Sequence, residues 1–238
     1  LATDPLVVTG GLSTRMAYAI APTGQTTQKP FSYMANGNID LDIFGYKMPL
    51  SFTYSSQNLS YQMASPIKMN RLKFNPQYKW VKLYLGQSSL SFSPYTLSGM
   101  QFSGVGLELT PKGPVKGSFM RGKLFDAVQY YPDKPLVQPV YERMATAFKV
   151  GYQKGGTTVE TSMLFANEDP TSLTLPTDTL LRVAPLQNVA YSFTGRFSPS
   201  KAVGLDIEYA TSAINLDRMN RQRPLDQMLW GDYAAVLR

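Results

Sequence analysis

The chain has 238 residues and a formal net charge of +7, with 16% charged and 12% aromatic residues, and it contains neither histidine nor cysteine. The charged fraction is well below the roughly 25% of soluble domains, whereas Tyr, Phe, Gly and Pro are plentiful, as strands joined by turns require. Without histidine and cysteine, a Ser-His-Asp triad, a thiol nucleophile and most transition-metal sites are excluded. We therefore expect no catalytic, metal-binding or cofactor-binding site.

Alternation of apolar and polar residues predicts strands that carry one residue set on each face. The pattern is clearest in Phe31–Ile43, where the odd positions are apolar or small and the even positions are mostly polar. The longer segments reach the roughly 9 to 11 residues with which a tilted strand crosses a hydrocarbon layer. In chain order the main segments are Leu12–Ile20, Phe31–Ile43, Leu50–Ser55, Tyr78–Leu85, Met144–Tyr152, Thr158–Phe165, Asn188–Thr194 and Val203–Tyr209. If Leu90–Leu97 is also a strand, short and long connections alternate throughout.

The predicted connections alternate in length. Gly, Pro and Ser mark tight turns, and these are Phe44–Pro49, Gly86–Ser89, Pro111–Pro114, Gln153–Gly156 and Ser198–Ser200. Long links are Ala21–Pro30, Asn58–Pro76, Phe125–Glu142 and Asn167–Gln187. Short turns on one side and long loops on the other are typical of a membrane β-barrel.

We therefore predict an all-β fold, an antiparallel up-and-down transmembrane β-barrel that forms one region over residues 1–238. About eleven strands lie between residues 11 and 211, and residues 212–238 form a loop with a further strand at Tyr233–Leu237. Single-chain bacterial barrels have an even number of strands. The odd number predicts that the chain is the N-terminal part of a larger barrel.

Two carboxylate pairs alternate onto the polar faces of predicted strands, namely Asp40 with Asp42 and Asp206 with Glu208. Same-face neighbours on one strand lie about 7 Å apart, which glycoside hydrolysis does not exclude. Polar residues also alternate into a wet lumen simply because the other face meets lipid. We interpret all four as lumen-lining residues, because no further motif accompanies them.

Three other features have both a functional and a structural interpretation. Asn167-Glu168-Asp169 resembles a cation site but lacks the ligand spacing of a calcium loop, which favours a solvated acidic turn. Gly104-Val105-Gly106 lies within a strand, which favours a bend or close backbone packing over phosphate binding. Aromatic residues near strand ends are interpreted as membrane-interface anchors and not as a stacking platform; these are Tyr18, Tyr54, Trp80, Tyr84, Tyr152 and Tyr209.

Several segments resemble large outer-membrane β-barrel proteins of the Bacteroidetes. The resemblance covers roughly residues 1 to 125 and is carried by Leu50–Gln57, Pro76–Leu83, Phe92–Gly99 and Gly104–Pro111. It implies secretion to the bacterial outer membrane, and it makes a role in the type IX protein-secretion machinery an expectation. It is a likeness of whole segments and contains no active-site signature.

The sequence favours a non-enzymatic outer-membrane barrel that acts as a pore or as a subunit of an assembly such as a protein-secretion translocon. Its expected partners are outer-membrane lipid, including lipopolysaccharide, and other outer-membrane proteins. Nucleic acid is not expected, because the basic residues are dispersed and no binding module accompanies them. The alternatives are a soluble envelope β-sandwich that binds glycans or protein partners, and an outer-membrane hydrolase that uses its carboxylates.

Overall fold

The computed structural model describes residues 6–18, 31–56, 70–94, 96–132, 138–175, 183–200, 203–219, 229–230 and 234–237. Within these ranges all extended regular structure is β-strand, which confirms the prediction of an all-β chain. No helix in the described part of the chain is long and apolar enough to cross a membrane.

The strands are long and antiparallel, and nearly every strand pairs with its neighbour in the chain. In order they are β1 (Leu6–Tyr18), β2 (Phe31–Ile43), β3 (Tyr46–Ser55), β4 (Arg71–Phe74), β5 (Gln77–Tyr78), β6 (Val81–Ser89), β7 (Gln101–Leu109), β8 (Val115–Phe125), β9 (Arg143–Lys154), β10 (Thr157–Glu168), β11 (Gln187–Ser200), β12 (Val203–Asn215), β13 (Leu229–Trp230) and β14 (Ala234–Leu237).

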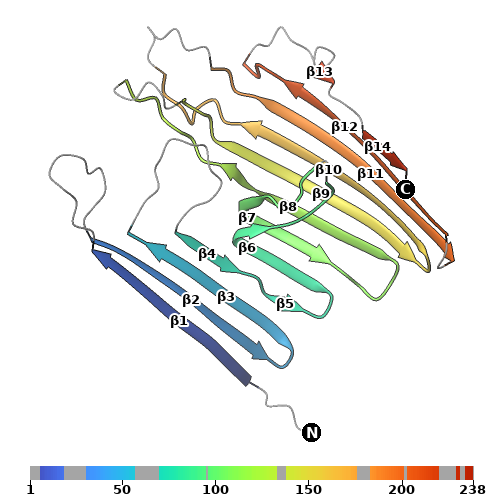
Figure 1. Ribbon diagram of the computed structural model, residues 1–238, viewed down its shortest axis with the longest axis horizontal. Helices are drawn as coiled ribbons and strands as arrows, with labels where there is room; N and C mark the ends of the chain where they lie inside the picture. Colours follow the sequence, from blue (N-terminus) through green and yellow to red (C-terminus); the bar gives the residue numbers. More distant parts are fainter. Residues whose placement is uncertain are drawn as a thin grey trace.

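All these strands belong to one sheet with the order β1-β2-β3-β4-β6-β7-β8-β9-β10-β11-β12-β13. Strand β5 follows β4 after a short break and pairs with β3 and β6, and β14 pairs with β12 beside β13. Figure 1 shows a curved, twisted sheet with β1 at one edge and β13 and β14 at the other. The predicted antiparallel up-and-down order is confirmed.

Two predicted elements near β6 were wrong. Tyr78–Leu85 is not one strand, because Lys79 and Trp80 form a tight turn in which Lys79 has a φ of 51°. Consequently Gly86–Ser89 is not a turn but the second half of β6. The long link Asn58–Pro76 was also too long, because β4 begins at Arg71 and pairs with β3 over Thr53 to Leu50.

The predicted strand Leu90–Leu97 is wrong as well. The backbone N–H of Phe92 donates to the carbonyl of Leu97 at 2.8 Å, so the chain turns back on itself, and Pro94 lies within this turn. The predicted final strand Tyr233–Leu237 corresponds to β14, Ala234–Leu237.

Register fixes which residues share a face. One row runs Leu6–Ile43–Tyr46–Tyr78–Val81–Leu109–Gly117–Val150–Thr161–Phe193–Tyr209 across the sheet. We call the face that carries this row the apolar face and the opposite one the polar face. Because side chains alternate with a period of two, every second residue of each strand joins the same face.

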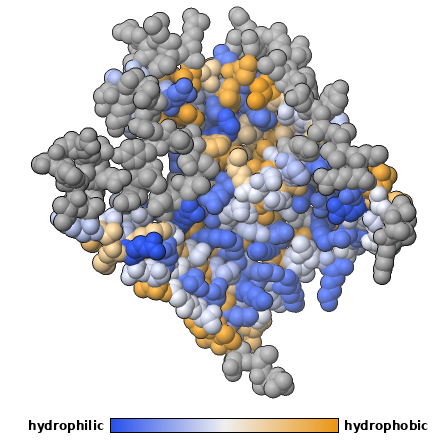
Figure 2. Space-filling model, viewed as in Figure 1, coloured by the Kyte–Doolittle hydropathy of each residue, from blue (hydrophilic) through white to orange (hydrophobic). Residues whose placement is uncertain are grey.

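The hydrophobic core lies on the polar face, because a folded segment of the chain packs against part of that face. Residues 90–100, which we call the inward segment, bring Leu90, Phe92 and Leu97 against Phe102, Met120, Leu124, Ala145, Ala147, Leu164, Ala166 and Ala190. Phe102 and Met120 are at most 1% exposed. Figure 1 shows this segment between β6 and β7 lying across the sheet, and Figure 2 shows hydrophobic residues gathered in that half of the same view, with hydrophilic residues below.

Candidate functional site

The apolar face is the most unusual surface of the described chain, because its large side chains have no protein cover there. Exposed fractions reach 71% for Leu12 and Met16, 60% for Leu72 and 52% for Val150. Most other exposed large apolar side chains are on this face, for example Leu6, Val8, Ile39, Val105, Phe119, Met144, Phe148, Phe193, Leu205 and Ile207. A contiguous apolar surface of this extent marks contact with a membrane or with another protein.

On the side of the long loops, the apolar surface is bounded by polar residues. A register row of Gln87–Ser103–Lys123–Met144–Asn167–Gln187–Asn215 crosses β6 to β12, and only Met144 in it is apolar. Along β10 the distance from Thr157 to Asn167 is about 34 Å at about 3.4 Å per residue. With a strand tilt of about 40°, this length spans about 26 Å, which matches the apolar band of roughly 25 Å in membrane barrels.

Aromatic side chains gather at both ends of the apolar face. Toward the short turns, the rings of Tyr46 and Tyr78 stack with centroids 3.8 Å apart, and the Lys79 ammonium lies 4.9 Å from the Tyr78 ring. Toward the long loops, the Tyr33 ring lies 6.1 Å from that of Phe31 and 5.9 Å from that of Tyr54. Rings with polar edges are favoured where hydrocarbon meets lipid headgroups.

Most of the predicted interface aromatics lie on the apolar face. Tyr18, Tyr54, Tyr152 and Tyr209 are there, with exposed fractions of 69%, 51%, 42% and 42%, and Trp80 is 46% exposed in the turn between β5 and β6.

The prediction that Tyr84 lies at the membrane interface was wrong. It is 7% exposed on the polar face, where its hydroxyl donates to Glu108 at 2.6 Å. The reason is the Lys79–Trp80 turn, which removes Tyr84 from the face of Tyr78.

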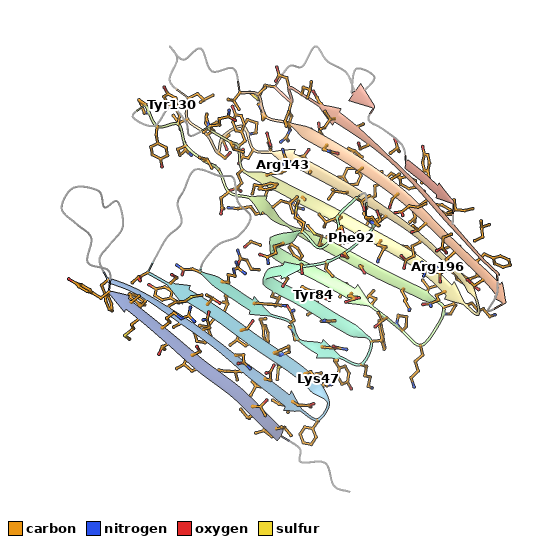
Figure 3. All side chains as sticks on the ribbon, viewed as in Figure 1. Lys47, Tyr84, Phe92, Tyr130, Arg143 and Arg196 are labelled. Atoms are coloured by element: carbon orange, nitrogen blue, oxygen red, sulfur yellow. The ribbon has the colours of Figure 1, made fainter. Side chains whose placement is uncertain are left out.

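The polar face near the short turns is lined by charged side chains in pairs. Arg196 donates to Asp206 at 2.8 Å, Lys149 lies 3.9 Å from Glu160, and Lys116 donates to Gln153 at 2.6 Å. Figure 3 shows Arg196 and Lys47 toward the short-turn end and Arg143 at the other end. Exposed pairs of this kind contribute at most about 1 kcal/mol each, so they indicate a wet surface more than a source of stability.

All four predicted lumen-lining carboxylates lie on the polar face, but they do not form one site. Asp40 accepts from Asn38 at 3.0 Å, and Asp42 accepts from the backbone N–H of Gly45 at 3.0 Å. Asp206 pairs with Arg196, and Glu208 has a buried Oε1 without a partner in the described residues. Strands β2 and β12 lie near opposite ends of the sheet order, so the two pairs cannot act together.

The inward segment is held on the polar face by hydrogen bonds as well as by apolar packing. The Thr96 hydroxyl lies 3.0 Å from that of Ser162, which lies 2.7 Å from that of Ser192. The Lys149 ammonium donates to the carbonyl of Ser91 at 3.3 Å. Segment and sheet are therefore joined over several strands.

Glycine makes room for the segment on β7. A Cβ on Gly106 would lie 2.9 Å from Leu90 Cδ1, and one on Gly104 would lie 2.3 Å from the carbonyl oxygen of Arg121. The close-packing interpretation of Gly104-Val105-Gly106 is therefore confirmed.

Glu168 organises the loops beyond β9 and β10. It is 4% exposed, and its carboxylate accepts from Arg143 at 2.5 Å and from the backbone N–H of Leu186 at 2.8 Å. Its carbonyl accepts from Arg218 at 2.9 Å. The prediction of a solvated acidic turn was therefore wrong for Glu168, because this carboxylate is buried and paired.

For Asp169 the turn interpretation is correct. Its carboxylate accepts from the backbone N–H and the hydroxyl of Thr171 at 2.9 and 2.8 Å, and these bonds hold its pKa below the ordinary value. Burial, together with the negative charge of Glu168, raises the pKa of Tyr141, whose hydroxyl donates to the Val183 carbonyl at 3.3 Å. The described residues contain no group of three or more acidic residues that could hold a metal ion.

We expect Glu168→Gln to lower the free energy of unfolding by about 1.5–3 kcal/mol, the usual worth of hydrogen bonds to a charged group. The substitution keeps the volume but leaves Arg143 without its anion. Urea denaturation of the purified chain would measure the loss, with Glu160→Gln as the control, because the ion pair of Glu160 with Lys149 is long and partly exposed. Equal losses in the two variants would contradict a special role for Glu168.

The sequence analysis missed the inward segment and the Glu168 cluster. One local signal for the segment was present: on β9 to β11 the polar-face positions near the long loops are Ala145, Ala147, Ala166 and Ala190 instead of charged residues. Small apolar residues on a face otherwise lined with charge indicate that another element packs there. The Arg143–Glu168 pair had no such signal, since it depends on register.

Comparison with protein-family models gave no match to this chain. Comparisons with curated proteins and with solved structures gave none either.

Proposed function

We propose that the chain forms part of the wall of a bacterial outer-membrane β-barrel and acts as a non-enzymatic subunit of a membrane assembly. The single observation that carries this proposal is the apolar face, which spans the length expected of a lipid-facing band and has no protein cover in the described ranges. Lipid on that face and water on the other account for the alternation in every long strand. Lipopolysaccharide is then a direct neighbour of the chain.

The same observation argues against the soluble β-sandwich. A sandwich packs a second sheet on its apolar face. Here the packed cover, the inward segment, lies on the polar face, whereas Leu12, Leu72 and Val150 are more than half exposed. Leaving such a surface in water favours aggregation.

The inward segment favours a subunit over an open pore. Leu90, Phe92 and Leu97 are at most 6% exposed and occupy the space in front of β7 to β10 that a water-filled channel would need. The hydrolase alternative has less support, because the carboxylates of the polar face are dispersed or form ion pairs with lysine and arginine. A place in the type IX secretion machinery rests on the resemblance to Bacteroidetes barrels and is part of the proposal.

Labelling with a lipid-soluble reagent tests the membrane assignment. We expect a lipid-soluble photoactivated carbene reagent to label Ile39 and Ile207 in native membranes, because both side chains are 42% exposed on the apolar face. Single cysteines at these two positions should resist a water-soluble maleimide, because a thiol in hydrocarbon does not ionise to the reactive thiolate. Cysteines at Asn38 and Glu208, their chain neighbours on the polar face, should react with a water-soluble maleimide instead. The native chain has no cysteine, so the background is clean. Equal reactivity of all four positions with the water-soluble reagent would reject the proposal.

A further inference from the structure

The sheet opens into a slot between β4 and β6. The two strands pair only at Lys73 with Gly86 and at Phe74 with Leu85, whereas β3–β4 pairing continues to Arg71 and β6–β7 pairing continues to Gln101. Gly86 shapes this opening: its φ is +84°, and a Cβ there would lie 2.2 Å from the Leu72 carbonyl oxygen. The result is a cavity of about 240 Å³ bounded by β3, β4, β6 and β7.

The lining of the slot combines positive charge with hydrogen-bonding groups. Arg71 and Lys73 border it from β4, and Ser88, Gln87 and Gln101 border it from β6 and β7. Guanidinium and ammonium groups favour phosphate, and carboxamides favour hydroxyl groups.

The slot lies where the apolar face ends. Gln87 belongs to the polar row that bounds this face, while Arg71 and Lys73 are on the polar face. Between them, Leu72 points to the apolar side with 60% of its surface exposed, beside Phe52. A headgroup held in the slot would therefore leave an attached acyl chain against Leu72 and Phe52.

We propose that this slot binds the phosphorylated sugar headgroup of a glycolipid in the surrounding membrane. Arg71 and Lys73 bind the phosphate, and Gln87 and Gln101 bind sugar hydroxyl groups. The volume is below the roughly 300 Å³ at which sites for drug-sized ligands begin, so it admits one sugar phosphate and not a whole lipid. The inference rests on the proposed function, because only a membrane-inserted chain meets such a lipid at this height.

The test uses the full chain in phosphatidylcholine nanodiscs doped with a diphosphorylated glucosamine glycolipid, with retained lipid counted by native mass spectrometry. Parallel samples contain phosphatidylglycerol, which has phosphate but no sugar, or free glucosamine 1-phosphate. We expect the glycolipid to be retained selectively. Arg71→Gln with Lys73→Gln should weaken retention about tenfold or more, the factor for one lost charge-assisted hydrogen bond.

Two further variants separate the site from general charge. Gln87→Leu with Gln101→Leu should weaken glycolipid retention without changing net charge, whereas Arg15→Gln with Lys47→Gln removes two polar-face charges elsewhere and should leave retention unchanged. Equal loss in both charge variants, or equal retention of phosphatidylglycerol, would overturn the site. If free glucosamine 1-phosphate competes equally well, the slot binds a soluble sugar phosphate and not the headgroup of a membrane lipid. Failure of the native chain to enter nanodiscs would instead overturn the proposed function, and the site with it.

Discussion

We expect lysine in place of Val150 to lower the free energy of unfolding in lipid vesicles by about 2–4 kcal/mol, the cost of a basic residue near the middle of the lipid-facing band of the proposed barrel. Val150 is 52% exposed on the apolar face, near the middle of β9, where it pairs with Gly117 and Thr161. About half of its surface is free in the described structure, so in the proposed barrel the penalty comes mainly from contact with lipid and not from lost packing.

The matched control is Thr194→Lys. Thr194 lies on the polar face, and its register partners are Glu160 on β10 and Glu208 on β12. A lysine there meets negative charge and water, so we expect a change within about 0.5 kcal/mol, as for ordinary surface substitutions.

Urea unfolding in phosphatidylcholine vesicles, followed by tryptophan fluorescence, gives both values. In water the two substitutions should cost similarly little, because Val150 is exposed and the partly exposed Thr194 lies between two glutamates. A neutral Val150→Lys in vesicles therefore contradicts lipid contact at this face, whereas a loss in Thr194→Lys of the same size contradicts a wet polar face.

The alternation of apolar and polar residues predicts most of this fold, because it can be recognised in each strand without knowledge of the neighbouring strands. In β2, the predicted bounds Phe31 and Ile43 are those of the structure, since the alternation continues through all thirteen residues with Met34 as the one exception. The outward position of Tyr152 and Tyr209 follows from the same rule. Such features need no information about neighbouring strands.

The wrong predictions lie where the local sequence pattern fits two different structures. Around Lys79 and Trp80 the aromatic residues fit a continuous strand, although the chain makes a tight turn there. Without that turn, Tyr84 is assigned to the wrong face of the sheet. Residues 90–97 alternate like a strand, yet Phe92 and Leu97 gain more from burial against Ala145 and Ala147 than from extending the sheet. The slot likewise depends on the point at which β4 and β6 stop pairing, which no single segment encodes.

Releasing the inward segment should open an ion path along the polar face. In the proposed barrel, Phe92 and Leu97 keep this path closed by packing over β7 to β10. We expect Phe92→Ser with Leu97→Ser to replace a silent trace in planar bilayers with discrete conductance steps. Removal of large buried side chains costs about 2–5 kcal/mol each, which exceeds the roughly 0.5–1.5 kcal/mol that each remaining hydrogen bond of the segment contributes.

A reversible lock separates opening of the segment from unfolding of the chain. The hydroxyl oxygens of Thr96 and Ser162 lie 3.0 Å apart, so cysteines at these two positions are placed to form a disulfide in a chain that has no other cysteine. In the Phe92→Ser, Leu97→Ser background, the oxidised form should be silent and the reduced form should conduct. Both forms contain the same substitutions, so a general loss of stability cannot produce this difference. Conductance that is the same before and after reduction would show that residues 90–100 do not close the interior.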